Sequence, residues 1–246
     1  MNPDDKRDQI YAKPLAAVAD FRFDENVVNV FPDMINRSVP GYATLVNMIG
    51  LLALRYAQAD SRVYDLGCSL GASTLSMMHH LQGVSCHYLA VDNSVAMIER
   101  ARQLLPKASA TSEVELICAN IQDVEIEDAS VVVMNYTLQF LNPEERLSIL
   151  QSIYRGLRPG GILILSEKIR LPDPEQDQRY IDLHHEFKRA NGYSDLEISQ
   201  KRTALEKVLI PETVATHTER LQQAGFAQVD NWYQCLNFVS LLAHKA

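Results

Sequence analysis

Two aspartates and a turn of small residues stand at positions where a nucleoside could be bound. Asp65 ends an apolar run, and Gly67, Ser69 and Gly71 follow it in the stretch "DLGCSLGAST". Small residues allow the backbone to approach a ligand closely. Asp92 lies 21 residues beyond Gly71 and ends a second apolar run, where an acid can accept both hydroxyl groups of a ribose. Together these residues indicate a nucleoside-binding site.

The turn does not carry the glycine pattern of a dinucleotide site. The G-x-G-x-x-G fingerprint is absent, so the sequence provides no pyrophosphate cradle of the usual spacing. A helix that begins after Gly71 would still present free N–H groups to an anion. S-adenosyl-L-methionine (SAM) is therefore favoured over NAD as the ligand. The alternative for Asp92 is that it only precedes Ser94 at the start of a helix.

Cysteine and histidine suggest two other kinds of site. No histidine lies near Cys68 in the sequence to activate its thiol as a nucleophile, so a small side chain in a tight loop explains Cys68 better. His184 and His185 suggest a metal, but adjacent residues on a helix point about 100° apart, so one ion would not readily bind both. A hinge or a hydrogen bond to substrate is favoured, and no metal site is predicted.

Short, apolar and β-branched runs alternate with helical segments after residue 60. Strands are expected near residues 61–66, 86–92, 114–118, 130–135 and 161–167, and helices near 71–81, 94–105 and 143–157. Runs of this kind are typical of a parallel sheet that is covered on both faces. The predicted fold class is therefore α/β, with a doubly wound, mostly parallel sheet. Two further helices are expected before it, near residues 24–36 and 41–57.

The pattern changes after the fifth strand. Residues 174–208 look helical and polar, and a helix near 211–224 ends at Gly225. The stretch "FAQVDNWYQCLNFVSLLAHKA" predicts a C-terminal antiparallel hairpin with a tight turn near Asn237, which brings the sheet to seven strands. We expect an N-terminal tail or arm over residues 1–23, mobile or loosely docked. Residues 24–246 would form a single SAM-binding α/β domain, with a helical insertion or lid near 174–208.

Composition narrows the class of protein. The chain has 246 residues and a net charge of −8, which does not suit direct nucleic-acid binding, because phosphate contacts need clustered Lys and Arg. Its four scattered cysteines are typical of reduced thiols and not of a disulfide framework. The N-terminus lacks a signal-peptide core, and the most apolar stretch, residues 47–57, carries Arg55 and is too short to span a bilayer. We expect a soluble cytoplasmic protein without a membrane partner.

Longer stretches of the chain resemble known families. "YDLGCSLGAST", "VDNS", "LRPGGILILSE" and the terminal hairpin are similar to class I SAM-dependent methyltransferases. "FDENVVNVFPDMINRSVPGY", "NYTLQFL" and "HHEFKRANGYSDLEISQKR" closely resemble the carboxy-S-adenosyl-L-methionine synthase family (CmoA type), and this resemblance runs from about Phe23 to the last strand. It implies a transferase that converts SAM and prephenate into carboxy-SAM and phenylpyruvate. It also implies a homodimer, and a functional partner that uses carboxy-SAM to modify the wobble uridine of tRNA.

The same resemblance implies which residues hold the ligand. Tyr42 would cover the methionine end, and Asn135 would lie near the sulfonium. The family usually has Asp-Ile after the third strand, where this chain has Asn120 and Ile121; the Asn amide oxygen can still accept a hydrogen bond from adenine, so binding is expected to survive in weaker form. The remaining contacts form the close-approach turn and hold the ribose and the adenine edge: Gly67, Cys68 and Ser69, then Asp92 and Asn93.

Arg202 is the predicted catalytic residue. A cation on this helix would by default face solvent. However, carboxy-SAM carries a carboxylate where SAM has an uncharged methyl group, and a carboxylate in a water-poor pocket needs a paired charge. Arginine grips both oxygens of a carboxylate better than lysine does. In the family the Arg of "SQKR" has this role, and Arg202 matches it; Lys188 and Arg189 are further candidates for the prephenate carboxylates.

The family mechanism requires no general base from the protein. Hydroxide leaves prephenate together with carbon dioxide and is the proposed base for the SAM methyl group, so the protein mainly positions the reactants and excludes water. Two alternatives stay open. One is an ordinary small-molecule SAM-dependent methyltransferase, in which Arg202 would be superfluous. The other is a non-catalytic SAM-binding partner of a tRNA-modifying enzyme.

Overall fold

The computed structural model describes residues 7–105 and 112–246. In this part of the chain a single mixed sheet of seven strands has the order β3-β2-β1-β4-β5-β7-β6. All neighbours are parallel except β7, which runs antiparallel to β5 and β6. The α/β fold class with its antiparallel C-terminal hairpin is thereby confirmed. The strands are β1 (Ser61–Leu66), β2 (Cys86–Asp92), β3 (Ser112–Cys118), β4 (Ala129–Asn135), β5 (Leu157–Lys168), β6 (Gln228–Cys235) and β7 (Phe238–His244).

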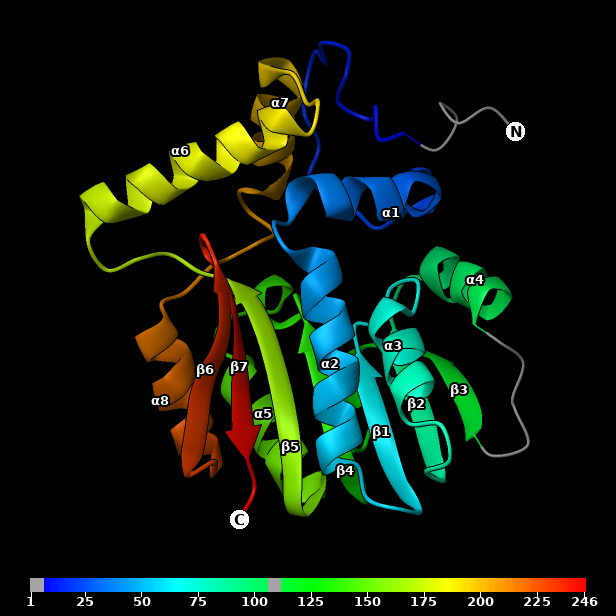
Figure 1. Ribbon diagram of the computed structural model, residues 1–246. Helices are drawn as coiled ribbons and strands as arrows, with labels where there is room; N and C mark the ends of the chain where they lie inside the picture. Colours follow the sequence, from blue (N-terminus) through cyan, green and yellow to red (C-terminus); the bar gives the residue numbers. More distant parts are fainter. Residues whose placement is uncertain (1–6, 106–111) are drawn as a thin grey trace.

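Helices cover both faces of this sheet (Figure 1). One face packs on α2 (Tyr42–Tyr56) and α3 (Ala72–His80), and the other on α5 (Arg146–Gly156) and α8 (Val214–Ala224). Helix α4 (Val95–Leu104) lies against β2 and β3. Two short 3₁₀ turns, η2 (Ile121–Asp123) and η3 (Leu138–Phe140), follow β3 and β4. The helices expected near 71–81, 94–105, 143–157 and 211–224 are all found.

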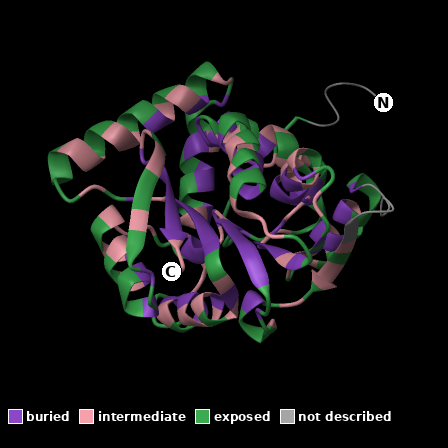
Figure 2. Ribbon diagram, turned by 60° about the horizontal axis from the view of Figure 1, so that its bottom comes forward, coloured by how far each residue is buried: buried purple, intermediate pink, exposed green. Residues whose placement is uncertain are grey.

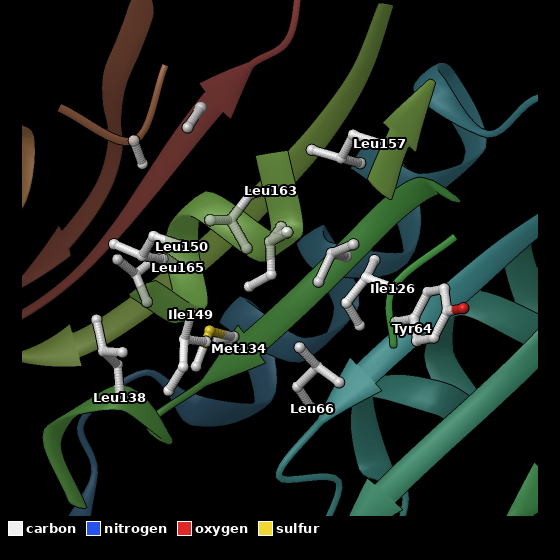
Figure 3. Packing of buried hydrophobic residues seen from close by; sticks show 14 of the residues in the cluster. Tyr64, Leu66, Ile126, Met134, Leu138, Ile149, Leu150, Leu157, Leu163 and Leu165 are labelled. Carbon is white, nitrogen blue, oxygen red and sulfur yellow. The ribbon is translucent and has the colours of Figure 1, made fainter. Parts of the chain in front are cut away.

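The inner strands β1, β4, β5 and β7 are buried along most of their length, whereas the edge strand β6 is largely exposed (Figure 2). Close packing of Leu66, Met134 and Leu163 from three neighbouring strands with Ile149 and Leu150 of α5 forms one half of the core (Figure 3). Continuous burial explains why these strands are apolar runs without alternation. Strand β5 begins four residues earlier than expected, at Leu157, because the Pro-Gly-Gly segment forms an irregularity within the strand and not a turn before it.

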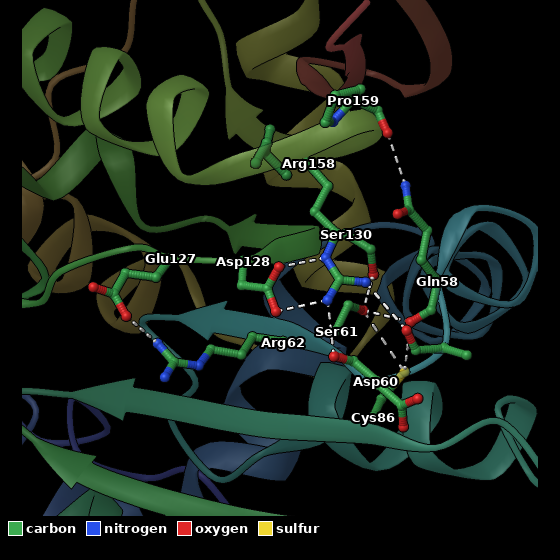
Figure 4. Close-up of polar contacts among 12 residues, drawn as sticks. Gln58, Asp60, Ser61, Arg62, Cys86, Glu127, Asp128, Ser130, Arg158 and Pro159 are labelled. Carbon is green, nitrogen blue, oxygen red and sulfur yellow. Dashed lines mark hydrogen bonds and ion pairs between the residues drawn. The ribbon is translucent and has the colours of Figure 1, made fainter.

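Polar contacts fasten the amino-terminal edge of the sheet (Figure 4). Arg158 donates to both carboxylate oxygens of Asp128 and to the carbonyls of Ala59 and Asp60. The loops that enter β1, β4 and β5 are thus tied together at the end opposite the predicted site. The carboxyl-terminal ends of the strands, at the other side of the sheet, are not tied together by these contacts.

Three helices lie beyond that carboxyl edge, at the top of Figure 1. They are α1 (Glu25–Ser38), α6 (Pro174–Ala190) and α7 (Asp195–Leu205). Side-chain caps begin them: Asp24 caps α1, Asp173 caps α6, and Ser194 forms a capping box with Glu197 at α7. The expected polar insertion is therefore two helices with a short turn between them.

The first described residues form an arm that is fastened to α7. Asp8, Tyr11 and Phe21 are buried, Phe21 N–H donates to the Ala204 carbonyl at 2.9 Å, and the Gln200 side chain donates to the Tyr11 carbonyl at 2.9 Å. Residues 7–23 are therefore docked more firmly than the expected mobile tail or loose arm, because their apolar side chains complete a small cluster with α1 and α7. Residues 1–6 of the predicted tail lie outside the described residues. No helix in the described part of the chain is long and apolar enough to cross a membrane.

Candidate functional site

A cavity of about 340 Å³ opens at the carboxyl ends of β1, β2, β4 and β5. The sheet, η2 and η3 form its floor, and α1, α6 and α7 close it from above. Strand order reverses between β1 and β4 at this point, and such switch points are where open α/β sheets bind ligands. Eight of the ten predicted ligand residues line this cavity: Tyr42, Gly67, Cys68, Ser69, Asp92, Asn93, Ile121 and Asn135.

The turn after β1 has a conformation that its small residues permit. Gly67 and Gly71 have φ near +81°, and Ser69 has φ +49°. A Cβ atom at Gly67 would lie 2.2 Å from Thr137 Oγ1, so any other residue would collide with the loop after β4. The backbone of this turn therefore comes close to the cavity, as the predicted close-approach turn requires.

Asp65 shapes the turn from beneath. Its Oδ2 accepts hydrogen bonds from the Thr74 backbone N–H at 2.9 Å and from Thr74 Oγ1 at 2.6 Å, which fixes the first turn of α3. Burial raises the pKa of this carboxyl to about 6, although the bonds from Thr74 oppose the rise. Asp65 Oδ2 thus holds the start of α3, while the residue also lines the cavity.

Asp92 is a carboxylate that faces the cavity. It accepts from the backbone N–H groups of Ser69 and Ser94, each at 2.9 Å, and it lines the cavity. Each carboxylate oxygen can accept a further hydrogen bond, so both ribose hydroxyls could be held here. The bond to Ser94 also shows the alternative role at the start of α4, and the two roles are compatible.

Asn120 does not line the cavity. Its Oδ1 accepts from Asn93 Nδ2 at 3.1 Å, and its Nδ2 donates to Asp123 at 3.0 Å. The amide oxygen that was expected to bind adenine thus holds Asn93 in this structure, while the neighbouring Ile121 does line the cavity. A direct contact between Asn120 and adenine stays a prediction.

Unpartnered polar groups mark the methionine end of the cavity. Asn135 Nδ2 donates to Ser73 Oγ at 3.2 Å, but Asn135 Oδ1 and the Tyr136 hydroxyl are buried without a partner among the described residues. Tyr136 also has φ +62°, an unusual value for a non-glycine residue. Buried polar groups normally find hydrogen bonds, so these two atoms fit the amino and carboxyl groups of a bound SAM. Tyr42 lies beside them, and burial raises the pKa of its hydroxyl.

Cationic side chains line the part of the cavity that adjoins Tyr136, beyond the Phe238 ring. Lys168 at the end of β5, Lys188 of α6 and Lys201 of α7 converge there with His184, and we call this group the cationic end. His184 Nε2 donates to the Ser38 carbonyl at 2.7 Å. Burial and the nearby lysines lower the pKa of His184 to about 2, so its ring is neutral. The sequence indicated Lys188 only as a further candidate for binding prephenate carboxylates, and it did not indicate Lys168. The reason is that the three lysines are far apart along the chain.

Arg202 is exposed and does not line the cavity. Its charge still lowers the pKa values of Lys168 and His185, which places it near the outer side of the cationic end. The inward position of α7 belongs to the preceding residue, Lys201, which is buried. The predicted grip of Arg202 on a carboxylate would require its side chain to move inward.

The structure gives Cys68 the environment of an inert thiol. Burial raises its pKa, and Asp65 and Asp92 raise it further, so the thiolate needed for nucleophilic attack is not formed. Among the residues that the structure describes, no group of three or more His, Cys, Asp or Glu side chains could hold a metal ion.

Comparison with known proteins gives two kinds of likeness. Residues 63–161 match the methyltransferase domain family. Over nearly the full length, the chain is similar to proteins named carboxy-S-adenosyl-L-methionine synthase. It is 61% identical to that of Citrifermentans bemidjiense, over 98% of this chain and 99% of the relative, and 57% identical to that of Aeromonas hydrophila, over 98% and 96%. The relative from Vibrio campbellii is 53% identical over the whole of both chains.

Solved structures resemble the fold at low sequence identity. Human N-acetylserotonin methyltransferase in complex with SAM gives a TM-score of 0.60 at 16% identity, covering 90% of this chain and 55% of that one. An O-methyltransferase family protein from Burkholderia thailandensis gives 0.63 at 17%, covering 91% and 61%. These similarities confirm the class I methyltransferase fold.

Proposed function

The chain belongs to the carboxy-S-adenosyl-L-methionine synthase family, and we propose that it converts SAM and prephenate into carboxy-SAM and phenylpyruvate. It is an enzyme of the transferase type, with SAM as substrate and carboxy-SAM as product. Its product would supply carboxymethyl groups for the modification of wobble uridine in tRNA by a partner enzyme.

The cationic end beside the SAM site is the observation that supports this reaction most directly. Methyl transfer to a neutral small molecule gives no reason to bury Lys168 and Lys188 in the substrate end of the cavity. Prephenate carries two carboxylates and carboxy-SAM carries one next to its sulfonium. Carboxylates in a cavity with little water require paired charges. An ordinary methyltransferase would leave these cations without a use.

The residues of the cavity fit SAM. Asp92 offers acceptors to the ribose, the turn at Gly67 permits close approach of the backbone, and Ile121 lines the cavity where adenine is expected. The unpaired Asn135 Oδ1 and Tyr136 hydroxyl provide a hydrogen-bond acceptor and a donor for the methionine end. The reactive methyl group would then point toward the cationic end.

The chemistry balances without a protein base. Prephenate loses carbon dioxide and hydroxide as its ring becomes aromatic, which gives phenylpyruvate. Hydroxide removes a proton from the SAM methyl group and becomes water, and the electron pair left on that carbon forms the bond to carbon dioxide. Because the leaving hydroxide takes the proton, neither Asp65 nor His184, which donates to the Ser38 carbonyl, is needed as a base. The protein then acts by positioning and by exclusion of water.

We further propose a homodimeric, cytoplasmic enzyme that contacts no membrane and no nucleic acid directly. Helix α6 projects from the body of the molecule (Figure 1), and Leu183 and Leu196 on α6 and α7 are exposed, which supports an interface near these helices. The four cysteines are free, which suits a reducing compartment. Light scattering at micromolar concentration tests the dimer, and a monomer over the working range would refute it.

The ligand that copurifies with the protein tests the proposed function. We expect carboxy-SAM, heavier than SAM by one carbon dioxide, because a complete SAM site stands beside the cationic end. Mass spectrometry of the molecule released by heat measures this. Plain SAM or S-adenosylhomocysteine alone would favour the ordinary methyltransferase. Constant SAM binding without turnover would favour the non-catalytic partner.

Arg202→Ala is expected to weaken carboxy-SAM binding without changing SAM binding. We propose that the Arg202 side chain turns inward onto the ligand's carboxylate. Loss of that charge-assisted hydrogen bond, worth roughly 1.5–3 kcal/mol, corresponds to about a ten- to hundredfold change in affinity. Arg202→Lys should recover part of it. Calorimetry with both ligands measures the effect, and Arg179→Ala, which removes another exposed cation, is the control. Unchanged carboxy-SAM affinity would return Arg202 to a solvated surface role.

A further inference from the structure

Two lysines of the cationic end form no ion pair within residues 7–105 and 112–246. Lys201 has one, because its Nζ lies 3.6 Å from Asp8 Oδ2 and also donates to Ser38 Oγ at 3.2 Å. Lys168 and Lys188 form no ion pair and no side-chain hydrogen bond with any residue that the structure describes. After Asp8 is assigned to Lys201, two positive charges are left for a ligand.

These two charges are held where water screens them poorly. Lys188 is only 8% exposed, and burial together with Lys201 and Lys168 lowers its pKa to about 7. The pKa of Lys168 is lowered by burial and by Arg202, and Asp177, which forms no ion pair with it, only partly offsets this. Two neighbouring cations that each disfavour the other's charge are strongly stabilised by an anion between them. The pair Lys168 and Lys188 should therefore favour a ligand with two negative charges.

An aromatic wall stands next to the same lysines. The Phe238 ring centroid lies 6.0 Å from Lys168 Nζ, 5.0 Å from the centroid of the neutral His184 ring and 5.8 Å from that of Tyr136. All four side chains line the cavity. Edge-to-face contacts of this kind suit an unsaturated or aromatic ring. The carboxylates and the ring of a ligand would therefore contact different side chains of the cavity.

We propose that Lys168 and Lys188 form a dicarboxylate subsite, in which each lysine pairs with one carboxylate and the ligand's ring packs on Phe238. The inference rests on the proposed function only in taking prephenate as the dicarboxylate. Lys201 has a different role, since it neutralises the buried Asp8 and fastens the N-terminal arm to α7.

Prephenate binding to the protein saturated with S-adenosylhomocysteine tests the subsite. S-adenosylhomocysteine lacks the methyl group, so binding is measured without reaction. Calorimetry should show that Lys168→Met and Lys188→Met each weaken prephenate binding by roughly ten- to a hundredfold, the loss expected for one charge-assisted hydrogen bond. The affinity for S-adenosylhomocysteine should not change. Methionine removes a buried charge without shortening the side chain much, so both variants should fold.

Control variants distinguish the effect of removing a lysine from the subsite from the effect of removing any positive charge. Lys207→Met removes an exposed lysine after α7 and should leave prephenate affinity unchanged. Lys188→Arg should recover much of the binding, because the charge returns. Phenylpyruvate, with one carboxylate, should bind the wild-type protein more weakly than prephenate does. Prephenate affinity that stays within about twofold of wild type in both methionine variants, or a wild-type protein that binds no prephenate, would overturn the inference.

The number of protons taken up when prephenate binds is a second measurable quantity. It would not change in a Lys188 variant if Lys188 had only a structural role. At pH 8 Lys188 is largely neutral, since its pKa is about 7, and pairing with a carboxylate raises that pKa, so binding takes up a proton. The charged and titratable groups around Lys188 are Lys168 of β5, Lys201 and Arg202 of α7, and His184 and His185 of its own helix, with Asp8 and Arg37 beyond Lys201. The binding enthalpy should therefore depend on buffer ionisation at pH 8, and Lys188→Met should reduce that dependence. Equal uptake in the variant would contradict the role of Lys188.

Turnover is measured separately. A wild-type protein that binds prephenate through the two lysines but forms no carboxy-SAM would refute the proposed function and support the subsite. A wild-type protein that forms carboxy-SAM, with methionine variants that bind prephenate normally, would refute the subsite alone.

Discussion

Replacing Asp92 with alanine is expected to weaken SAM binding by at least about a hundredfold. Two ribose hydroxyls would donate to this carboxylate, and each charge-assisted hydrogen bond is worth roughly 1.5–3 kcal/mol. The two together correspond to a loss on the order of a hundred- to ten-thousandfold. The same substitution releases the Ser69 N–H, which Asp92 holds at 2.9 Å, so the turn after β1 would also lose an anchor. Titration calorimetry with SAM measures the change.

Two further variants make the Asp92 result specific. Asp92→Asn keeps acceptor oxygen but not the charge, so its affinity should fall between those of wild type and the alanine variant. Glu99→Ala removes an exposed acid from the helix that follows Asp92 and should leave SAM affinity unchanged. A loss below about tenfold for Asp92→Ala would mean that Asp92 only begins α4.

Arg146→Met is expected to lower the free energy of unfolding by about 2–4 kcal/mol, because buried carbonyls lose a charged hydrogen-bond donor while Glu212 keeps its pair with Arg220. Arg146 is fully buried in α5. It pairs with Glu212 and donates to the carbonyls of Gln139, Leu141 and Ile210 at 3.0–3.2 Å. Methionine would leave those carbonyls without this donor in a site with little water.

The loss at Arg146 would also reach the binding site. Gln139 and Leu141 belong to the loop after β4 that lines the cavity, and Arg146 joins this loop to the segment before α8. Urea denaturation measures the effect. Arg155→Met is the control, because Arg155 is an exposed arginine of the same helix. Equal stability of the Arg146 and Arg155 variants would show that Arg146 is dispensable.

The fold could be predicted because its local signals agree with one another. β-Branched runs such as "SVVVMN" are buried on both faces of the sheet, and turns such as "DLGCSLG" need φ values that glycine permits. The N-terminal arm was less predictable. Its charges and prolines suggest a loose segment, yet Tyr11 and Phe21 are buried against α7. Only tertiary packing supplies the partners that hold it.

The nucleoside half of the site was predictable for the same reason. Asp92 follows a strand and Gly67 a turn, so strand topology alone brings them to one edge of the sheet. The part of the site that α6 and α7 contribute could not be predicted in this way. Lys201 and Arg202 are neighbours on α7, and residues one apart point about 100° apart on a helix. Which of them faces the cavity depends on how Ile198 and Ala204 pack, and the sequence of this polar helix does not reveal that.

The cationic end shows the limit of sequence reasoning most clearly. Lys168, Lys188 and Lys201 come from β5, α6 and α7, and only the folded chain brings them to the same cavity. A lysine taken singly from a polar segment is normally a solvated side chain. Its burial beside other cations without a counterion is visible only in three dimensions.

One measurement tests the proposed reaction most directly. The purified protein, freed of bound ligand, is incubated with SAM and with prephenate that carries carbon-13 in its ring carboxylate. Mass spectrometry should detect labelled carboxy-SAM and phenylpyruvate in equal amounts, with no S-adenosylhomocysteine formed. Unlabelled SAM that stays unchanged, or S-adenosylhomocysteine that accumulates with a methylated acceptor, would contradict carboxyl transfer from prephenate.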